Sequence, residues 1–515
     1  MIVDDQHATL AFLSSDAAYP GFDGPVERID THGAAVFLAG ARAYKVKRAV
    51  RYDYMDFSTL ERRRVACEAE VVINRRTAPS LYLGVRPLVR RPDGSLEIDG
   101  PGEPVEWLVE MQRFDQAGLL DRRARQGELD ETTMIAVAEA IARLHDTAEP
   151  RPDHGGTAGM RWVVEGNTDA LRADGAGIVA EREVQELDRL SRLAIDTHGS
   201  LLDRRQKEGQ VRQCHGDLHL RNICTIDGQP TLFDAIEFND ELACVDVLYD
   251  FAFLLMDLAH RELPGLANAA FNRYMSLRGD WDGLALLPCF LSCRAAVRAK
   301  TSLAAARLQE NRAEIGRLER RAREYLAMAI RFLRPAPPRL IAVGGPSGSG
   351  KSTLAAAVAP RLEPFPGAVV LRSDVTRKAL CGVPQTQPLD AAAYTEAMNR
   401  RVYERMTEQA ERSVRARHPV IVDAVFRHDA ERRALEEAAR RTGTLFTGIW
   451  LHAPVDRLES RVRGRSGDAS DATVEVLQHQ LHELRAPRGW HQIDATRAPE
   501  AMRDEACSLI HATRT

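Results

Sequence analysis

Two patterns of apolar and polar residues divide the sequence of 515 residues, and the change comes at a proline-rich segment. After this segment, five short apolar runs alternate with stretches of helical periodicity. This order predicts a parallel sheet with helices on both faces, because helical crossovers join the strands of parallel sheets. The runs are Leu340 to Val343, Val369 to Leu371, Val420 to Val422, Leu445 to Leu451 and His491 to Ile493.

The chain before the segment begins with strand-like patterns and continues as helices. Val36 to Ala39 and Ala43 to Lys47 flank a short turn at 40–42, and this arrangement predicts a β-hairpin. Residues 114–334 are mainly helical in pattern, as in Thr132 to His145, where apolar residues recur with helical spacing. Residues 1–334 are therefore expected to combine a small β-rich part with a larger helical part.

A helix is predicted to follow the hairpin. Ser58-Thr-Leu-Glu61 fits the capping-box pattern that opens helices. Its apolar stripe is expected at Val65, Ala69, Val72 and Ile73, with Glu68 at the edge of the stripe and Glu70 further round.

The proline-rich segment is Arg334 to Pro338, read as RPAPP. Prolines lack the backbone N–H and favour extended spacers, so this segment predicts a boundary between folded units. We expect one domain at 1–334, a linker at 335–338 and a second domain at 339–515.

The strongest motif follows the first strand of the second domain. Residues 345–352 fit the pattern G-x-x-x-x-G-K-[ST], and a helical stretch follows, as a phosphate-binding loop requires. Backbone N–H groups of such a loop point at phosphate oxygens, the lysine reaches the β- and γ-phosphates, and the serine holds Mg²⁺. The expected ATP-binding residues here are Gly345, Pro346, Ser347, Gly348, Ser349, Gly350, Lys351, Ser352 and Thr353. Asp423, at the end of a predicted strand, is expected to join Ser352 at the metal.

Composition narrows the possible partners. The formal net charge is −4, so general nucleic-acid binding is not expected. The N-terminus does not resemble a secretory signal, and the longest apolar run, Val245 to Ala259, contains three aspartates and is too short to span a membrane. The eight cysteines lack C-x-x-C spacing, which favours reduced thiols in a cytoplasmic protein.

Lysine is scarce, with six lysines among 70 basic residues. A lysine at a predicted catalytic position is then unlikely to be accidental, because arginine is the default cation in this chain. Lys45 and Lys47 share one face of the second hairpin strand. A strand lysine followed by a helix glutamate is the pair that positions phosphates in kinase-like folds, which points to Lys45 with Glu68. Spacing alone leaves Lys47 and Glu70 open as the alternatives.

A second candidate catalytic motif is His215-Gly-Asp217-Leu-His219-Leu-Arg-Asn222. The spacing from Asp217 to Asn222 is that of a kinase catalytic loop, in which the aspartate accepts the acceptor proton and the asparagine holds metal. Asp234, at the end of an apolar run, can supply a further metal carboxylate.

Residues 30–330 resemble the aminoglycoside phosphotransferase and choline kinase family, since HGDLHLRN matches its H-G-D-x-H-x-x-N loop. The resemblance implies an α+β bilobal protein-kinase-like fold, with an N-lobe at about 1–113 and a C-lobe at 114–334. It further implies that Asp217 is the base, that Asn222 and Asp234 bind Mg²⁺, and that Lys45 contacts ATP. Glu110 and Met111 would form the hinge beside adenine. One departure, Asp234-Ala-Ile-Glu237 where antibiotic-modifying members usually carry an aromatic residue after the aspartate, argues against antibiotic substrates.

Residues 339–496 resemble P-loop kinases of small hydroxyl-bearing acceptors, such as gluconate kinase, polynucleotide 5′-kinase and zeta toxins, grouped as the AAA_33 type. The resemblance rests on the phosphate loop and on Asp374 and Arg377, which have D-x-x-R spacing. It implies that Asp374 engages the acceptor hydroxyl and that Arg461 and Arg465, one helical turn apart, belong to a lid over the phosphates.

The whole chain thus resembles tandem fusions of these two families. We expect an ATP-dependent, Mg²⁺-dependent phosphotransferase that acts on hydroxyl groups of small molecules at two sites. The alternative is a regulatory protein in which one nucleotide-binding module gates the other. A sensor needs no catalytic base, so the complete catalytic sets favour the enzyme.

Overall fold

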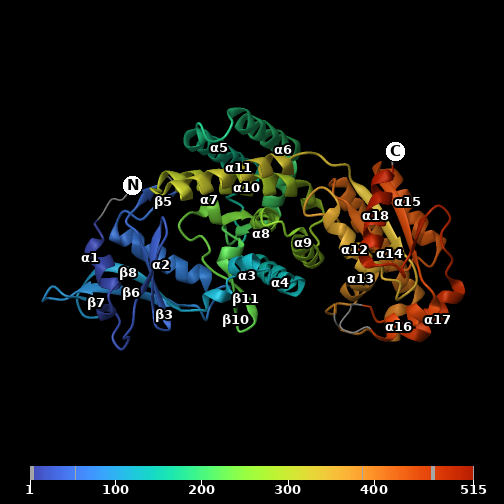
Figure 1. The fold of residues 1–515 in the computed structure, drawn as a ribbon, viewed down its shortest axis with the longest axis horizontal. Helices are drawn as coiled ribbons and strands as arrows, with labels where there is room; N and C mark the ends of the chain where they lie inside the picture. The colour runs from blue at the N-terminus through green and yellow to red at the C-terminus, as the bar shows by residue number, and fades with distance from the viewer. Residues whose placement is uncertain (1–4, 53, 386, 465–469, 514–515) are drawn as a thin grey trace. The chain divides into compact units, whose positions relative to one another are not determined.

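The computed structural model describes residues 5–52, 54–385, 387–464 and 470–513. Contacts divide the chain into two compact units (Figure 1). One comprises Met1–Gly166 with Ile195–Asp257, and the other comprises Asn167–Ala194 with Leu258–Thr515. No helix in the described part of the chain is both long and apolar enough to cross a membrane.

The first unit contains a six-stranded antiparallel sheet in the order β1-β2-β3-β8-β6-β7. The predicted hairpin is confirmed, with Val36 of β2 opposite Lys45 of β3. Apolar side chains such as Phe37, Val46 and Leu108 are buried against one face. The strands are β1 (Glu27–Asp30), β2 (Ala34–Ala39), β3 (Arg42–Lys47), β6 (Tyr82–Arg90), β7 (Leu96–Ile98) and β8 (Glu103–Gln112).

Helix α2 (Leu60–Asn74) follows the hairpin, but a different face is buried from the one expected. Val65 and Val72 are 52% and 69% exposed, so the predicted stripe was wrong at these two positions, whereas Ile73 is buried as expected. Cys67 and Val71 pack instead against the sheet residues Tyr82 and Val109. Thr59 caps the helix, and its hydroxyl accepts a hydrogen bond from the Arg62 backbone at 3.3 Å.

The predicted helix at 132–145 is confirmed as α4 (Glu131–Thr147), which Asp130 caps. The apolar run from Val245 is a short strand, β12 (Cys244–Asp246), followed by α8 (Val247–His260). A two-stranded hairpin follows the segment at 215–222. Its strands are β10 (Ile223–Ile226) and β11 (Gln229–Leu232), and the other elements up to α8 are α1 (His7–Leu13), β4 (Arg51–Tyr52), β5 (Met55–Asp56), α3 (Leu120–Gln126), α5 (Gly156–Gly175), α6 (Glu181–Lys207), β9 (Val211–Gln213) and α7 (Asp240–Ala243).

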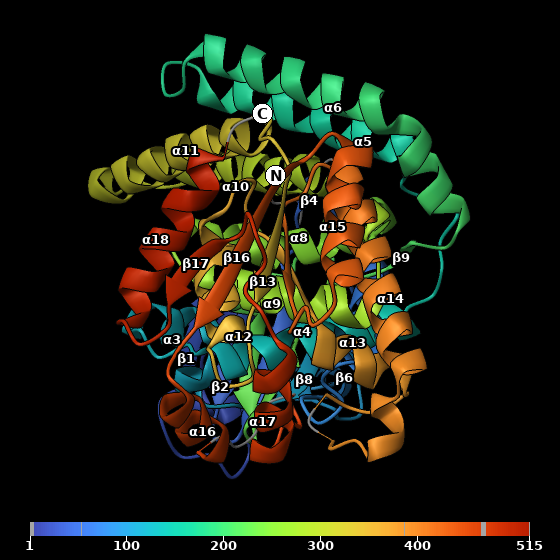
Figure 2. The same cartoon turned by 90° about the vertical axis from the view of Figure 1, so that its right-hand side faces the viewer.

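The second unit contains the predicted parallel sheet, and all five expected runs are strands. Their order is β14-β15-β13-β16-β17, and each neighbouring pair is parallel. Helices cover both faces, with α18 on one side and α14 and α15 on the other (Figure 2). The elements are β13 (Arg339–Gly344), α12 (Lys351–Val358), β14 (Val369–Arg372), α13 (Ser373–Leu380), α14 (Glu396–Arg415), β15 (Val420–Asp423), α15 (Asp429–Thr442), β16 (Leu445–His452), α16 (Val455–Arg463), α17 (Val474–Glu483), β17 (His491–Asp494) and α18 (Pro499–Ala512).

Three helices before the proline segment belong to this second unit: α9 (Pro264–Arg278), α10 (Leu287–Arg307) and α11 (Arg312–Phe332). Helix α9 covers the edge of the sheet at β14. Asn272 Oδ1, on this helix, accepts a hydrogen bond from the Val370 backbone of β14 at 2.7 Å. Asn268 Nδ2 donates to the Ala368 carbonyl at 3.1 Å. The segment at 334–338 therefore lies inside this unit, and the domain boundary expected there stays a prediction.

Two candidate phosphotransfer sites

The first candidate site is built around two lysines of β3. Lys45 Nζ lies 2.8 Å from Glu70 Oε1 and 2.6 Å from Asp234 Oδ1. Lys47 forms ion pairs with Glu70 and Glu237. Because residues two apart on a strand point to the same side, the sheet directs both ammonium groups into one cluster of three carboxylates.

The glutamate that α2 contributes to this cluster is Glu70, whereas the sequence predicts Glu68. Glu68 lies on the solvent side of α2, where its carboxylate accepts a hydrogen bond from Arg64 Nη1 at 2.7 Å. The cause is the rotation of the helix already described, since the face that carries Cys67 and Val71 also carries Glu70 into the interior.

Burial and neighbouring charges shift the pKa values of this cluster in opposite directions. Desolvation would lower the pKa of Lys45, but the carboxylates of Asp234 and Glu70 hold that pKa well above its usual value. Desolvation would raise the pKa of Asp234, yet the Lys45 ammonium outweighs it and lowers that pKa to about 2. For Glu237 desolvation prevails, and its pKa is raised. Lys45 and Asp234 are therefore both charged at neutral pH.

The loop that carries Asp217 ends at Asn222. Asn222 Nδ2 donates to the Asp217 carboxylate at 3.0 Å and to its backbone carbonyl at 2.9 Å. These bonds fix the orientation of the Asp217 carboxylate. They also leave the amide oxygen of Asn222 as the atom that could bind a metal.

Asp250 of α8 braces this loop. Its carboxylate accepts hydrogen bonds from the backbone of His215 at 3.2 Å and of Gly216 at 2.8 Å. His145 Nε2 lies 3.1 Å from the same carboxylate. A buried carboxylate that gathers several donors in this way holds the loop in one conformation.

Asp234 occupies a turn with a left-handed backbone, at φ +61°. Two side chains that the sequence did not single out hold this turn. The Tyr82 hydroxyl accepts a hydrogen bond from the Asp234 backbone at 3.1 Å, and Asn74 Oδ1 accepts one from Ala235 at 2.9 Å. Neither residue lies in a recognisable motif. For Asn74, the one sequence signal is a polar residue at the end of the helix predicted after the hairpin.

Glu110 and Met111 lie on β8, directly beside β3, as Tyr44 pairs with Glu110 and Ala43 with Met111. The Glu110 carboxylate accepts a hydrogen bond from Arg86 Nε at 2.9 Å. Their expected position beside adenine stays a prediction.

The second candidate site is the loop between β13 and α12. Gly345 and Gly348 have φ of +141° and +79°, values that favour glycine. A Cβ atom at Gly345 would lie 2.5 Å from the Leu451 carbonyl oxygen, and one at Gly348 would lie 2.6 Å from that of Leu458. The packing therefore requires glycine at both positions. Within the same loop Pro346, Ser347 and Ser349 are buried, while Thr353 in the first turn of α12 is exposed.

The loop brings Lys351 and Ser352 to the carboxyl ends of the strands. Lys351 Nζ donates to the Pro346 carbonyl at 2.9 Å, and Ser352 Oγ donates to Asp423 Oδ2 at 2.5 Å. Arg372, which the sequence did not indicate, lies 3.5 Å from the same Asp423 carboxylate.

Asp374 and Arg377 lie on α13, which follows β14. Desolvation and the nearby Asp423 raise the pKa of Asp374. Arg377 is buried, its guanidinium lies 4.7 Å from the ring centre of Tyr394, and its Nη1 donates to the Ala393 carbonyl at 2.9 Å. Asp374 is therefore a carboxylate with an unusual proton affinity close to the phosphate loop, which is common at catalytic sites.

The lid predicted for this site is described in part. Arg461 lies on α16, and its Nη2 donates to the Ala495 carbonyl at 2.8 Å. Arg465 lies outside the described residues. Gln480 of α17, which the sequence did not indicate, reaches the phosphate loop, where its Oε1 accepts a hydrogen bond from the Ser347 backbone at 2.9 Å.

Both sites offer oxygen ligands of the kind that Mg²⁺ prefers. The first has the Asn222 amide oxygen and the Asp234 carboxylate, and the second has the Ser352 hydroxyl and the Asp423 carboxylate. These donor sets fit Mg²⁺, and they also fit the roles that the sequence gave to the four residues.

Two family models match separate parts of the chain. Residues 95–287 match the phosphotransferase enzyme family, APH, and residues 340–487 match the AAA domain of the AAA_33 family. The catalytic loop at 215–222 lies in the first region, and the phosphate loop at 345–352 lies in the second. This is the tandem arrangement expected from the sequence.

Relatives over nearly the whole length come from mycobacteria. "Uncharacterized protein Rv2004c" of Mycobacterium tuberculosis is 32% identical over 469 residues, which cover 89% of this chain and 90% of the relative. "Uncharacterized protein Mb2027c" of Mycobacterium bovis shows the same identity and coverage.

Solved structures resemble one part of the chain each. A sugar kinase from Janibacter sp. is 23% identical, with a TM-score of 0.27, and covers 34% of this chain and 95% of its own. A choline/ethanolamine kinase family protein from Mesorhizobium loti is 13% identical, with a TM-score of 0.36, and covers 64% of this chain and 98% of its own.

Identity and coverage with the mycobacterial proteins are sufficient to assign a family. The chain belongs to the family of these proteins, and in this chain a region that matches the APH family precedes a region that matches the AAA_33 family.

Proposed function

We propose that the protein is a kinase with two ATP sites, each of which transfers the γ-phosphoryl group to a hydroxyl group of a small molecule. The observation that carries the proposal is the meeting of Lys45, Glu70 and Asp234, from three distant segments, beside the ordered pair Asp217 and Asn222. Phosphoryl transfer requires mainly positioning and charge neutralisation, and these residue types supply both.

In the first site, Asp217 would accept the proton of the acceptor hydroxyl while the hydroxyl oxygen forms its bond to the γ-phosphorus and ADP leaves. The hydrogen bonds from Asn222 hold the Asp217 carboxylate ready for that proton. Lys45 would bind phosphate oxygens, and Glu70 would keep the ammonium in place. Mg²⁺, held by Asn222 and Asp234, would neutralise charge on the phosphates.

In the second site, the amides of the phosphate loop and Lys351 would bind the phosphates, with Ser352 and Asp423 holding Mg²⁺. Asp374 would engage the acceptor hydroxyl, and the raised pKa of this carboxyl suits a group that takes up a proton. Arg377 and the lid residue Arg461 would stabilise the transferred group.

The rival proposal is a nucleotide sensor in which one module gates the other. The hydrogen bond from the Ser347 amide to Gln480 favours it, because this amide would otherwise be available to phosphate. A sensor would bind ATP without rapid ADP release in the presence of an acceptor.

Counting bound nucleotide tests the two-site proposal. Wild-type protein is expected to bind two equivalents of ATP in calorimetry, and Lys351→Ala is expected to bind one. A single equivalent in the wild type, or none in a folded Lys351→Ala variant, would show that both motifs build one composite site. ADP release, measured with each site disabled in turn, then separates the kinase from the sensor.

A further inference from the structure

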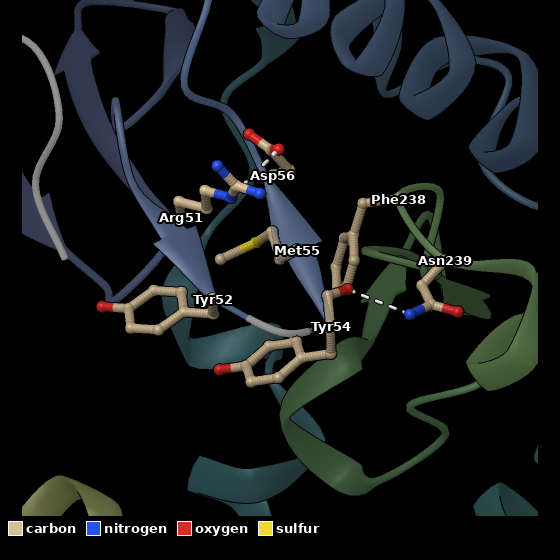
Figure 3. Close-up of a pocket in the computed structure, with 7 residues that line it drawn as sticks. All are labelled: Arg51, Tyr52, Tyr54, Met55, Asp56, Phe238 and Asn239. Atoms are coloured by element: carbon tan, nitrogen blue, oxygen red, sulfur yellow. Dashed lines mark hydrogen bonds and ion pairs between the residues drawn. The ribbon is translucent and has the colours of Figure 1, made fainter.

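The first unit contains a pocket of about 460 Å³, a size typical of small-molecule sites. It lies between strands β4 and β5 on one side and Phe238 and Asn239, which follow the turn at Asp234, on the other (Figure 3). Three aromatic side chains line it: Tyr52, Tyr54 and Phe238. None of them has a role in the phosphate chemistry described above.

The aromatic rings form a wall with exposed surface. Tyr52 and Tyr54 are stacked, with ring centres 5.7 Å apart and an interplanar angle of 8°. The Phe238 ring centre lies 6.5 Å from that of Tyr54, which is 41% exposed. In Figure 3 the two tyrosine hydroxyls point to the same side. An exposed wall of this kind offers flat apolar surface together with polar hydroxyls.

A hydrogen bond and the course of the chain connect this wall to the first candidate site. Asn239 Nδ2 donates to the Tyr54 carbonyl at 3.0 Å (Figure 3). Phe238 directly follows Glu237 in the chain, and Glu237 pairs with Lys47. The pocket is thus fixed to the chain segment that carries Asp234.

A further ring lies near this wall, since the ring centre of His32 is 6.3 Å from that of Tyr52. Desolvation lowers the pKa of His32, while the negative charges of Asp217 and Asp234 act on it in the opposite direction. The His32 ring therefore neighbours Tyr52, and the charges of Asp217 and Asp234 act on its imidazole.

The charges of the pocket argue against a cationic ligand. Among the described residues that line it, the carboxylate is that of Asp56, which is paired with Arg62, lies 3.6 Å from Arg51, and accepts a hydrogen bond from the Ser58 backbone at 3.0 Å. An ammonium group would have to compete with two guanidinium groups for this carboxylate. Stacking also turns one face of each tyrosine toward the other, so the two rings do not enclose a cation from several sides.

We propose that this pocket binds the acceptor of the first site, and that the acceptor is a neutral or anionic sugar rather than an organic cation. Sugar rings have apolar C–H faces that pack on aromatic rings, and hydroxyls that the tyrosine hydroxyls can bond. Arg51, whose side chain is 71% exposed, adds a positive charge to the pocket that would attract an acidic substituent such as a carboxylate or phosphate. The inference rests on the proposed function, because it names the acceptor class of the same site.

The test uses the full chain with Lys351→Ala, so that only the first site turns over. ADP release is measured with neutral sugars, sugar acids, sugar phosphates, choline and kanamycin as acceptors. A sugar of the first three groups is expected to give the highest kcat/KM. Preference for choline or kanamycin, or transfer to none of the panel by protein that still binds ATP, overturns the sugar assignment. Loss of ATP binding at the Lys45 site would instead contradict the proposed function itself.

Variants then locate the acceptor. With the best sugar, Tyr54→Ala is expected to raise the acceptor KM roughly tenfold and to leave the KM for ATP unchanged, since the ring would contact the acceptor and not the nucleotide. Tyr54→Phe keeps the ring and is expected to retain most of the affinity. Trp162→Ala is the matched control, because Trp162 is also an exposed aromatic residue, 47% exposed, on α5 of the same unit. An unchanged acceptor KM in folded Tyr54→Ala would place the acceptor elsewhere.

Discussion

The two candidate sites are equipped for the same task by different parts of the chain. The first holds its charges on side chains, with Lys45 and Lys47 paired to Glu70, Asp234 and Glu237. The second presents backbone amides of one glycine-rich loop, with Lys351 as its added cation. A side-chain site needs buried partners to hold its shape, whereas a backbone site needs glycines where a Cβ would collide.

In each candidate site, a group that we propose binds phosphate is engaged by another residue. Lys45 is bonded to Asp234, the proposed metal ligand, at 2.6 Å, and the Ser347 amide is bonded to Gln480 at 2.9 Å. ATP would have to replace both contacts. The first is an ion pair and the second a neutral hydrogen bond, so the contacts differ in strength.

The largest effect is expected from Asp217→Asn, which should lower transfer at the first site by about 10²–10⁴-fold. The change removes the base but keeps the size of the side chain. ATP binding at this site should persist, because Lys45 and the metal ligands hold the nucleotide. ADP release and calorimetry, both in the Lys351→Ala background, measure the two quantities. Loss of Mg·ATP binding in folded Asp217→Asn would show that this residue holds nucleotide instead.

A smaller effect should separate the two lysines of the first site. Lys45→Met removes a charged contact to phosphate and is expected to raise the KM for ATP by about 10–100-fold, from the ~1.5–3 kcal/mol of a charge-assisted hydrogen bond. Lys47→Met leaves Glu237 buried without its cation, so its main effect should be on stability, with a loss of about 3–5 kcal/mol.

Kinetic titration with ATP and urea unfolding of both variants give this comparison. A normal KM in Lys45→Met together with a raised KM in Lys47→Met would assign the phosphate contact to Lys47. Lys207→Met serves as the control, since this lysine lies at the end of α6, outside the cluster.

The difference between a site built from one contiguous loop and a site built from distant side chains also explains what the sequence could predict. The phosphate loop is contiguous, so its motif identified the loop, the strand before it and the helix after it, and the five apolar runs predicted all strands of the parallel sheet. The first site is assembled from separate segments that include Lys45, Glu70 and Asp234. The sequence motif of this site covers only the loop at 215–222. The choice of Glu68 failed because it depended on the rotation of α2, and packing against Tyr82 and Val109 sets that rotation. Tyr82 and Asn74, which hold the Asp234 turn, are known only once the fold brings them there.

The smallest predicted effect concerns Gln480, whose side chain occupies one amide of the phosphate loop. A neutral hydrogen bond contributes about 1 kcal/mol, so Gln480→Ala should tighten nucleotide binding at the second site by roughly fivefold, because phosphate no longer has to displace the amide oxygen.

Gln478→Ala is the matched control. It removes a glutamine from the same helix whose Nε2 donates to Glu459 at 3.2 Å and not to the phosphate loop. Calorimetry with ADP in the Lys45→Met background restricts the measurement to the second site. Weaker binding in Gln480→Ala would reverse the interpretation, because the glutamine would then assist the bound nucleotide. In that case α17 would act as a closing element over the phosphates, and only the first site would keep a phosphate-binding group engaged until ATP arrives.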